Sequence, residues 1–197
     1  MIKNRNLYEK KDERFGFIMS KMYNFFTMTN TSKNIYNTII SDIAIKKFNS
    51  LLDIGCGTGV VIKSIAKKYD RVYYGIDPSP SMINIANKNN FNVTFILGSN
   101  RKLPKNKKFD LIFSSLSFHH WPDKETSITH IIDSLNPGGT FVIYESDKDK
   151  MGYLTRIFTG SHAMTKKEFK EISFNIRKKI RIRHKNSLII AEIKKVP

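Results

Sequence analysis

The sequence contains a single cysteine, Cys56, among its 197 residues. An internal disulfide bond and a metal site built on several thiolates are therefore excluded, and we expect no metal. The chain also lacks a run of about 20 apolar residues, which a membrane-spanning helix needs. Its first residues are polar and carry no apolar core of a secretory signal. These absences favour a reduced, cytoplasmic protein, and a hydrophobic fraction of 40% is typical of a globular domain.

Acidic residues are also scarce. There are 17 Asp and Glu against 34 Lys and Arg, which gives a net charge of +17. Such an excess favours polyanionic partners, namely nucleic acid, an anionic membrane surface or phosphorylated small molecules. A general bias toward Asn, Ile and Lys along the chain is the alternative explanation.

The chain shows no repeat and no low-complexity linker, so we expect one domain over residues 1–197. Residues 1–30 are polar, then aromatic and Met-rich, as in a lid that packs on an apolar surface, and residues 31–197 would form the core. A helix is predicted from residue 31, with Thr31 or Ser32 as its cap. Its apolar face would carry Ile35, Ile39, Ile40, Ile43 and Phe48.

From residue 51, short apolar runs alternate with helical stretches. The runs predicted as strands are "LLDIG" (51–55), "RVYYGID" (71–77), "NVTFILGS" (92–99), "FDLIFSSLS" (109–117) and "TFVIYES" (140–146). This alternation predicts an α/β fold, with a doubly wound, mostly parallel sheet covered by helices on both faces.

The C-terminal residues 176–195 break this alternation and predict an antiparallel hairpin that turns at "HKNS" (184–187). Alternate positions of its first strand are basic and share one face, while Ile176, Ile180 and Ile182 share the other. The basic residues are Arg177, Lys179, Arg181, Arg183 and Lys185. We expect the basic strand at the sheet edge, where charge guards against aggregation, and the apolar second strand inside.

The run that ends at Asp53 opens into glycines at alternate positions, Gly55, Gly57 and Gly59. A P-loop would continue with Gly-Lys-Ser/Thr, whereas two valines follow here, which argues against ATP or GTP hydrolysis. The loop is also one residue tighter than the dinucleotide-binding pattern. Asp77, at the end of the next strand, suits a hydrogen bond to both ribose hydroxyls of a nucleoside, and its charge would repel a 2′-phosphate. The alternative role for Asp77 is a helix cap.

Four segments together resemble the class I S-adenosylmethionine-dependent methyltransferases, the broad group that includes ubiquinone and menaquinone methyltransferases. They are "LLDIGCGTG" (51–59), "YYGIDPSPSMINIA" (73–86), "FDLIFSSLSFHHW" (109–121) and "SLNPGGTFVIYE" (134–145). The resemblance spans about residues 31–197. It implies a seven-stranded Rossmann-like sheet, in which the C-terminal hairpin supplies the seventh strand.

The resemblance implies S-adenosylmethionine as the cofactor. The glycines would let the backbone approach its methionine end, with Asp53 at the methionyl amino group and Asp77 at the ribose. Met82 would pack beside the ribose or adenine, or else lie in the helix core. The implied cofactor-binding set is Asp53, Gly55, Gly57, Gly59, Asp77, Pro78, Met82, Ser99, Asn100, Ser114 and Ser115.

One departure from the family concerns the adenine. Where the family usually reads Gly-Asp-Ala after the third strand, this chain reads Gly98-Ser99-Asn100. The carboxylate that accepts a hydrogen bond from the adenine amino group is therefore absent. Ser99 or the Asn100 side-chain oxygen can accept instead, through a weaker, uncharged bond. We expect modestly reduced cofactor affinity.

Methyl transfer is an in-line displacement, in which a base is needed only where the acceptor must lose a proton. His119 and His120, after the fourth strand, are the candidate general bases, and their alternative role is to stack on the cofactor or to cap the loop. Glu145, which ends the fifth strand, either faces the substrate or anchors a loop. No Asn/Asp-Pro-Pro-Tyr stands at residues 114–117, which argues against adenine-N6 and glutamine-amide methylation.

These observations predict a methyltransferase that acts on a small-molecule acceptor, since the chain is short and carries no recognition module. The first alternative is an RNA methyltransferase that uses the basic C-terminal surface, although no stacking aromatics accompany those charges. A second alternative, motivated by Ser99-Asn100, is a protein that binds S-adenosylmethionine without transferring its methyl group.

Overall fold

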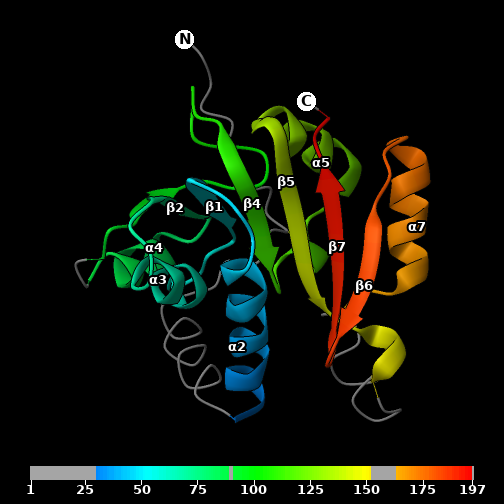
Figure 1. Ribbon diagram of the computed structural model, residues 1–197, viewed down its shortest axis with the longest axis horizontal. Coiled ribbons are helices and arrows are strands. Elements are labelled where there is room, and N and C mark those ends of the chain that lie inside the picture. The colour runs from blue at the N-terminus through cyan, green and yellow to red at the C-terminus, as the bar shows by residue number, and fades with distance from the viewer. Residues whose placement is uncertain (1–29, 89–90, 152–162, 197) are drawn as a thin grey trace.

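The computed structural model describes residues 30–88, 91–151 and 163–196. Within them, seven strands form one sheet (Figure 1). The strands are β1 (Ser50–Ile54), β2 (Val72–Asp77), β3 (Thr94–Leu97), β4 (Phe109–Ser115), β5 (Leu135–Ser146), β6 (Arg181–Lys185) and β7 (Leu188–Lys194). Their order is β3-β2-β1-β4-β5-β7-β6. Strands β1 to β5 pair in parallel and β7 is antiparallel to both of its neighbours, so the predicted α/β sheet with an antiparallel hairpin is confirmed.

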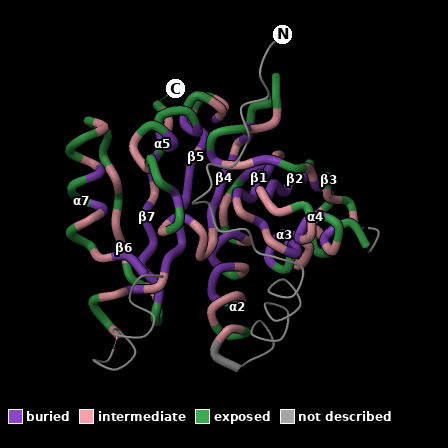
Figure 2. The backbone as a smooth tube through the Cα atoms, turned by 180° about the vertical axis from the view of Figure 1, so that it is seen from behind, coloured by how far each residue is buried: buried purple, intermediate pink, exposed green. Residues whose placement is uncertain are grey.

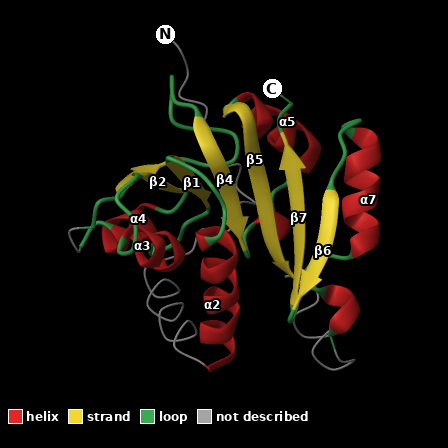
Figure 3. Ribbon diagram, viewed as in Figure 1, coloured by secondary structure: helices red, strands yellow, loops and turns green. Residues whose placement is uncertain are grey.

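Helices cover both faces of the sheet (Figure 3). On one face lie α2 (Asn30–Ala44), α3 (Val60–Ala66) and α4 (Pro80–Ala86), whose isoleucines share an apolar cluster with β1, β4 and β5. On the other face lie α5 (Lys124–Asp133) and α7 (Lys166–Asn175). Burial concentrates in the central strands and in the helix faces turned toward them (Figure 2). Within the described ranges, no helix has the length and apolar character needed to cross a bilayer.

The helix α7 and the start of β6 differ from the expectation. The strand predicted from residue 176 begins at Arg181, because α7 runs to Asn175 and Arg177 takes a left-handed conformation with φ of 51°. The helix starts at a capping box, in which Thr165 and Glu168 each accept a hydrogen bond from the other's backbone N–H. The order of the C-terminal strands is as predicted, with basic β6 at the edge and apolar β7 inside the sheet.

The helix α2 also starts earlier than expected. It begins at Asn30, so Thr31 and Ser32 lie inside its first turn and the predicted caps are wrong. Phe48 lies beyond the end of α2, buried and edge-on to Tyr73. Residues 1–29 of the expected lid fall outside the described residues.

A buried polar network joins α2 to the sheet. The Tyr144 hydroxyl donates to Asp42 Oδ2 at 2.8 Å, and Arg183 Nη2 donates to Asp42 Oδ2 at 2.5 Å and to Glu192 Oε1 at 3.1 Å. Lys46 Nζ donates to Glu192 Oε1 at 2.6 Å. Burial tends to raise the pKa of Asp42, but the hydrogen bonds from Arg183 and Tyr144 outweigh it and lower the pKa. The charge of Arg183 is therefore satisfied by α2 and β7.

Replacement of Arg183 by Met should lower the free energy of unfolding by about 2–3 kcal/mol, because it leaves the buried Asp42 carboxylate with only Lys46, 3.9 Å away, as a cation. Since the folded-state pKa of Asp42 is lowered, this stabilisation is complete above the unfolded pKa of about 4 and is lost as the pH falls further. Urea unfolding at neutral and at acid pH measures both effects. The exposed neighbour Arg181, changed to Met, is the control and should cost less than about 0.5 kcal/mol. An equal cost at both positions would contradict the role of the network.

Candidate active site

The glycine loop, residues 55–59, joins β1 to α3 at the carboxyl edge of the parallel strands. The backbone N–H groups of Gly55 and Cys56 both donate to the Ile76 carbonyl, at 2.8 and 3.0 Å, which ties the loop to β2. The φ angles of Gly55, Gly57 and Gly59 are 75°, 54° and 79°. This left-handed path is one that glycine adopts at little cost, so the alternate glycines are required by the backbone itself.

The loop after β4 packs directly on the glycine loop. A Cβ on Gly55 would lie 2.3 Å from Ser117 Oγ. Ser117 Oγ also donates to the Ile54 carbonyl at 3.1 Å and lies 2.8 Å from Ser114 Oγ. Ser114 is wholly buried by these contacts, whereas Ser115 at the end of β4 is half-buried. The two segments that the sequence analysis assigned to the site therefore meet.

Two buried carboxyl groups end β1 and β2. Asp53 is 1% exposed, and its Oδ1 has no hydrogen-bond partner within the described part of the chain. Burial raises the pKa of Asp53 well above its usual range, and the nearby charge of Asp77 raises it further. An unpaired, buried carboxylate oxygen fits a cationic group that brings its own N–H donors, such as the ammonium group of an amino acid.

Asp77 ties the glycine loop to the turn before α4, although the residue that caps this helix is Ser79. Its Oδ2 accepts from the Gly57 N–H at 2.9 Å, and its Oδ1 accepts from the Ser79 N–H at 2.8 Å, just before α4. Burial raises the pKa of Asp77, although these two bonds oppose the shift. A carboxylate has about four lone-pair sites, so two remain for further donors. The acid can thus hold the loop and still receive two hydroxyls.

The amide of Asn100 has a fixed orientation. Its Nδ2 donates to Ser127 Oγ at 2.7 Å, and the Ser127 hydroxyl donates to the Asp123 carbonyl within α5. Because the single proton of Ser127 is used in this way, its oxygen must accept, and the Asn100 NH₂ group must face it. The Asn100 Oδ1, which makes no hydrogen bond with another described residue, then points elsewhere as a neutral acceptor. Ser99 Oγ already accepts from the Arg101 N–H at 3.2 Å.

Met82 and Pro78 lie at the start of α4. Met82 is 4% exposed but belongs to neither apolar cluster of the described residues, and Pro78 is half-buried. The Met82 N–H donates to the cap residue Ser79 at 3.4 Å. The Met82 side chain is thus buried on α4, and both of its expected places, beside the ligand and in the helix core, fit this burial.

His119 forms a pair with Glu145 that the site set from the sequence omitted. His119 Nδ1 lies 2.8 Å from Glu145 Oε2, and the His119 backbone N–H donates to Glu145 Oε1 at 3.2 Å. Glu145 is wholly buried and the His119 side chain is 6% exposed. Because a carboxylate only accepts, a neutral His119 ring donates from Nδ1 and carries its lone pair on Nε2. In the sequence, the sign of this pair was a single acid, Glu145, within the otherwise uncharged run "TFVIYES" (140–146).

His120 is in a different environment from His119. The two rings are 3.9 Å apart between centroids and tilted by 47°, and His120 is exposed. Over the described ranges, no three His, Cys, Asp or Glu side chains group so that they would hold a metal ion.

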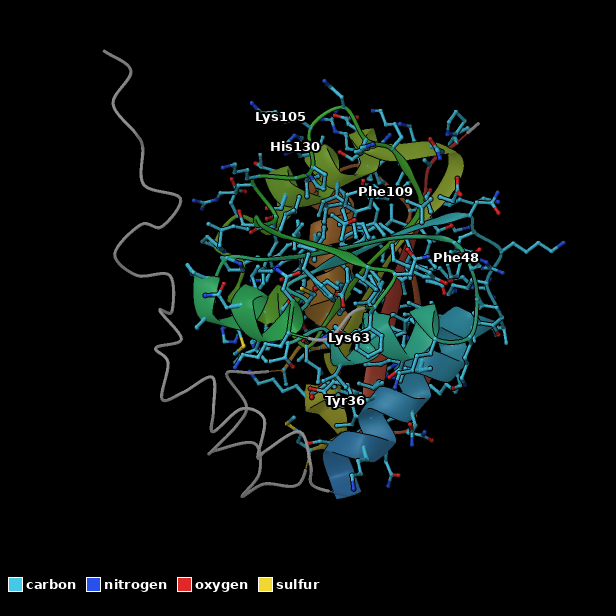
Figure 4. All side chains as sticks on the ribbon, turned by 90° about the vertical axis from the view of Figure 1, so that its left-hand side faces the viewer. Tyr36, Phe48, Lys63, Lys105, Phe109 and His130 are labelled. Carbon is cyan, nitrogen blue, oxygen red and sulfur yellow. The ribbon has the colours of Figure 1, made fainter. Side chains whose placement is uncertain are left out.

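Lys63 places a positive charge beside the glycine loop, which the sequence analysis missed. Its Nζ donates to the Thr58 carbonyl at 3.0 Å and lies 5.3 and 5.2 Å from the ring centroids of Phe91 and Phe95. Figure 4 labels Lys63 on α3, on the side that faces the viewer. Burial lowers its pKa. A Cβ on Gly59 would lie 2.6 Å from Phe95, so this ring closes the loop from the β3 side.

Comparison with known proteins gives one consistent family. The sequence profile of the methyltransferase domain matches residues 51–139. An uncharacterised methyltransferase of Anoxybacillus flavithermus is 33% identical over 114 residues, which are 56% of this chain and 53% of the relative. A malonyl-[acyl-carrier protein] O-methyltransferase of Priestia megaterium is 25% identical over 160 residues, 71% of this chain and 58% of the relative. The chain thus spans little more than half the length of these relatives.

Solved structures show the same fold. The plantazolicin methyltransferase BpumL in complex with S-adenosylhomocysteine has a TM-score of 0.74 at 17% identity, with 91% of each chain covered. A candidate S-adenosylmethionine-dependent methyltransferase of Methanococcus maripaludis has a TM-score of 0.75 at 20% identity, over 96% of this chain and 98% of that one.

Gly138 is a control that separates the packing of Ser117 on Gly55 from backbone strain. Its φ of 74° is nearly that of Gly55, 75°, but a Cβ added to Gly138 would have no atom within 4 Å. Gly138→Ala should lower the free energy of unfolding by about 1–2 kcal/mol, the cost of the left-handed backbone alone. Gly55→Ala should cost clearly more and abolish binding of S-adenosylhomocysteine, measured by urea unfolding and calorimetry. Equal behaviour of the two variants would contradict the contact.

Binding of S-adenosylhomocysteine should release a proton, because its ammonium group favours the ionised form of Asp53, whose pKa is raised in the unliganded protein. The affinity should therefore rise with pH until Asp53 is ionised without ligand. Calorimetry at one pH in phosphate and in Tris measures the proton from the difference in heat.

Asp53→Asn keeps the shape of the side chain and should remove both the proton release and the pH dependence. Asp133→Asn, at an exposed acid on α5, is the control and should retain them. Proton release unchanged in Asp53→Asn would assign the proton to another group.

Proposed function

Because residues 51–139 match the methyltransferase domain and the chain has the class I S-adenosylmethionine-dependent methyltransferase fold, we propose that it methylates a small-molecule acceptor that must lose a proton. The observation that carries the proposal is the His119–Glu145 pair at the carboxyl edge of the sheet. A histidine oriented by a buried carboxylate suits an acceptor that must lose a proton, whereas an acceptor that is already a nucleophilic anion needs no base.

The cofactor would lie along the carboxyl ends of β1, β2 and β3. Asp53 Oδ1, which lacks a donor in the described chain, would receive the methionyl ammonium group. Asp77 would accept from the two ribose hydroxyls with its remaining lone pairs. The adenine amino group would donate to Asn100 Oδ1, whose orientation Ser127 fixes. Pro78 and Met82 would border the ribose, and Ser114 and Ser115 the loop beside the methyl group.

The reaction needs alignment and one proton transfer. When bound, S-adenosylmethionine would supply a methyl group on a positively charged sulfur, which leaves as a neutral thioether when the acceptor lone pair, or the carbanion of an acidic carbon, attacks in line. The acceptor proton goes to His119 Nε2, and Glu145 stabilises the imidazolium that forms. A hydroxyl, an amine or an acidic carbon are the acceptor groups that use this step.

The two alternative functions make different demands. An RNA methyltransferase would need a basic surface around the cofactor edge, whereas the described loops there are close to neutral in charge. A protein that binds the cofactor without turnover would need no buried pair at His119 and Glu145. Transfer of labelled methyl groups from S-adenosylmethionine to phenols, amines, carbon acids and bulk RNA, in separate reactions, discriminates among the three. Tight cofactor binding with no acceptor methylated would sink the proposal.

Once an acceptor is found, His119→Ala should lower kcat by about 10²–10⁴-fold, the usual contribution of a general base. The affinity for S-adenosylhomocysteine should stay unchanged. Glu145→Gln keeps the size of the side chain but not its charge, and should also lower kcat, since the imidazolium that forms in the reaction loses its counter-ion. The exposed His120 supplies the matched control, and His120→Ala should retain most of kcat. An unchanged kcat in His119→Ala would mean that the acceptor needs no base.

A further inference from the structure

The positive charge of the described chain is concentrated at the amino edge of the sheet, the upper edge in Figure 1. Five segments reach this edge, because each precedes a parallel strand or ends β7: residues 45–49, 67–71, 104–108, 176–180 and 194–196. We call them the basic edge. They carry 13 Lys and Arg and one acid, Asp70. The cations are Lys46, Lys47, Lys67, Lys68, Arg71, Lys105, Lys107, Lys108, Arg177, Lys178, Lys179, Lys194 and Lys195.

The opposite edge, which holds the candidate cofactor site, is close to neutral. Its described loops are residues 55–59, 78–79, 98–103, 116–123, 147–151 and 186–187. They carry four cations and three acids: Arg101, Lys102, Lys148, Lys150, Asp123, Asp147 and Asp149. The net charge of the described residues therefore lies mainly on the face turned away from the candidate cofactor site.

Few charges of the basic edge are neutralised by acids inside the protein, although Lys108 and Lys195 donate to backbone carbonyls. Three more cations, Lys67, Arg71 and Lys107, lie over aromatic rings. Of its 13 cations, only Lys46 makes an ion pair with an acidic side chain in the described chain. Three acids border the edge. Glu192 is paired with Lys46 and Arg183, and Asp110 accepts four hydrogen bonds from neutral groups. The third acid, Asp133, is exposed. Figure 4 shows Lys105 projecting at this upper edge.

Exposed apolar side chains gather at the same edge. Six large hydrophobic side chains are exposed in the described residues, and four of them are here. Ile45 and Val196 are 80% exposed, Phe174 is 84% exposed, and Val72, the first residue of β2, is 54% exposed. Ile45 lines one hollow with Lys47, Arg71 and Lys194, and Phe174 lines another with Arg177, Lys178 and Lys179.

We propose that the basic edge docks the protein on an anionic lipid surface. Lysines and arginines near such a surface are attracted to acidic headgroups, and apolar side chains between them gain by entering the boundary between headgroups and acyl chains. A nucleic acid would satisfy the charges alike and would offer a base to stack on Phe174, but it offers nothing to the aliphatic Ile45, Val72 and Val196, which cannot stack on bases. The mixture of cations with exposed aliphatic side chains therefore selects a lipid surface.

The location also separates docking from catalysis. The basic edge and the candidate cofactor site lie at opposite ends of the strands, so a lipid surface bound at one end leaves the other open to solvent. Docking should therefore not compete with S-adenosylhomocysteine, and this inference does not depend on which acceptor is methylated.

Flotation of the full chain with vesicles tests the proposal. We expect binding to vesicles of phosphatidylcholine with phosphatidylglycerol, no binding to phosphatidylcholine alone, and a loss of binding as salt rises. The triple variant Lys47→Gln, Lys105→Gln, Lys178→Gln should weaken binding by about 100-fold. The triple variant Ile45→Ser, Phe174→Ser, Val196→Ser should weaken it by about tenfold or more at the same net charge.

Matched controls come from the rest of the chain. Lys102→Gln, Lys148→Gln, Lys166→Gln removes the same charge elsewhere, and Val60→Ser, Leu97→Ser removes the two other exposed apolar side chains. Both controls should bind vesicles as the parent does. The proposal is overturned if the parent does not float with anionic vesicles, or if both charge variants lose binding equally. It is also overturned if the apolar triple variant binds unchanged, or if polyuridylate is bound more tightly than anionic vesicles.

Discussion

The contact between Gly55 and Ser117 is the constraint on which the candidate site depends. At this point the backbone after β1 and the side chain after β4 approach so closely that even a methyl group does not fit. The contact fixes the glycine loop against the loop that leads to His119. The donors and acceptors of both loops are thereby preorganised before any ligand enters, which is the condition for tight and well-aligned binding. The close approach is made with Gly55 in a left-handed conformation, which glycine adopts at little cost.

The buried acids show a second aspect of preorganisation. Asp53 and Asp77 lie at the ends of adjacent strands, and burial disfavours the charge of both. Asp77 is compensated by two backbone N–H groups, whereas Asp53 Oδ1 has no partner in the described chain. A folded protein tolerates such an unsatisfied oxygen where a ligand supplies the missing donor, and this is the reason to place Asp53 in the candidate site.

Much of the sheet could be predicted from the sequence, because parallel strands buried on both faces are continuous apolar runs between turn residues. The helix α7 could not be predicted in this way, because its sequence "KKEFKEISFN" buries only Phe169 and Ile172. The alternating Ile and Arg residues that follow it are typical of a strand. The left-handed Arg177 interrupts that alternation, and no local pattern announces it.

The candidate site was predictable to the extent that its residues stand at strand ends. Asp53, Asp77 and the glycines follow directly from that rule. The partner of His119 does not, because Glu145 is 26 residues away and becomes a neighbour only when β5 pairs with β4. The same holds for Ser127, which orients Asn100 from across 27 residues. Pairings of this kind depend on the three-dimensional register, and spacing along the chain carries no signal for them.

Successive residues of β5 serve opposite faces of the sheet. Tyr144 turns to one face, where it bonds Asp42 on α2, and the next residue, Glu145, bonds His119 of the loop after β4. Because side chains alternate along a strand, a shift of β5 by one residue would exchange the two, placing an acid against an acid and a phenol against a histidine. The strand therefore cannot slide without losing the α2 anchor and the histidine pair together. An insertion or deletion within β5 would therefore remove both contacts at once, whereas a substitution that keeps the register would not.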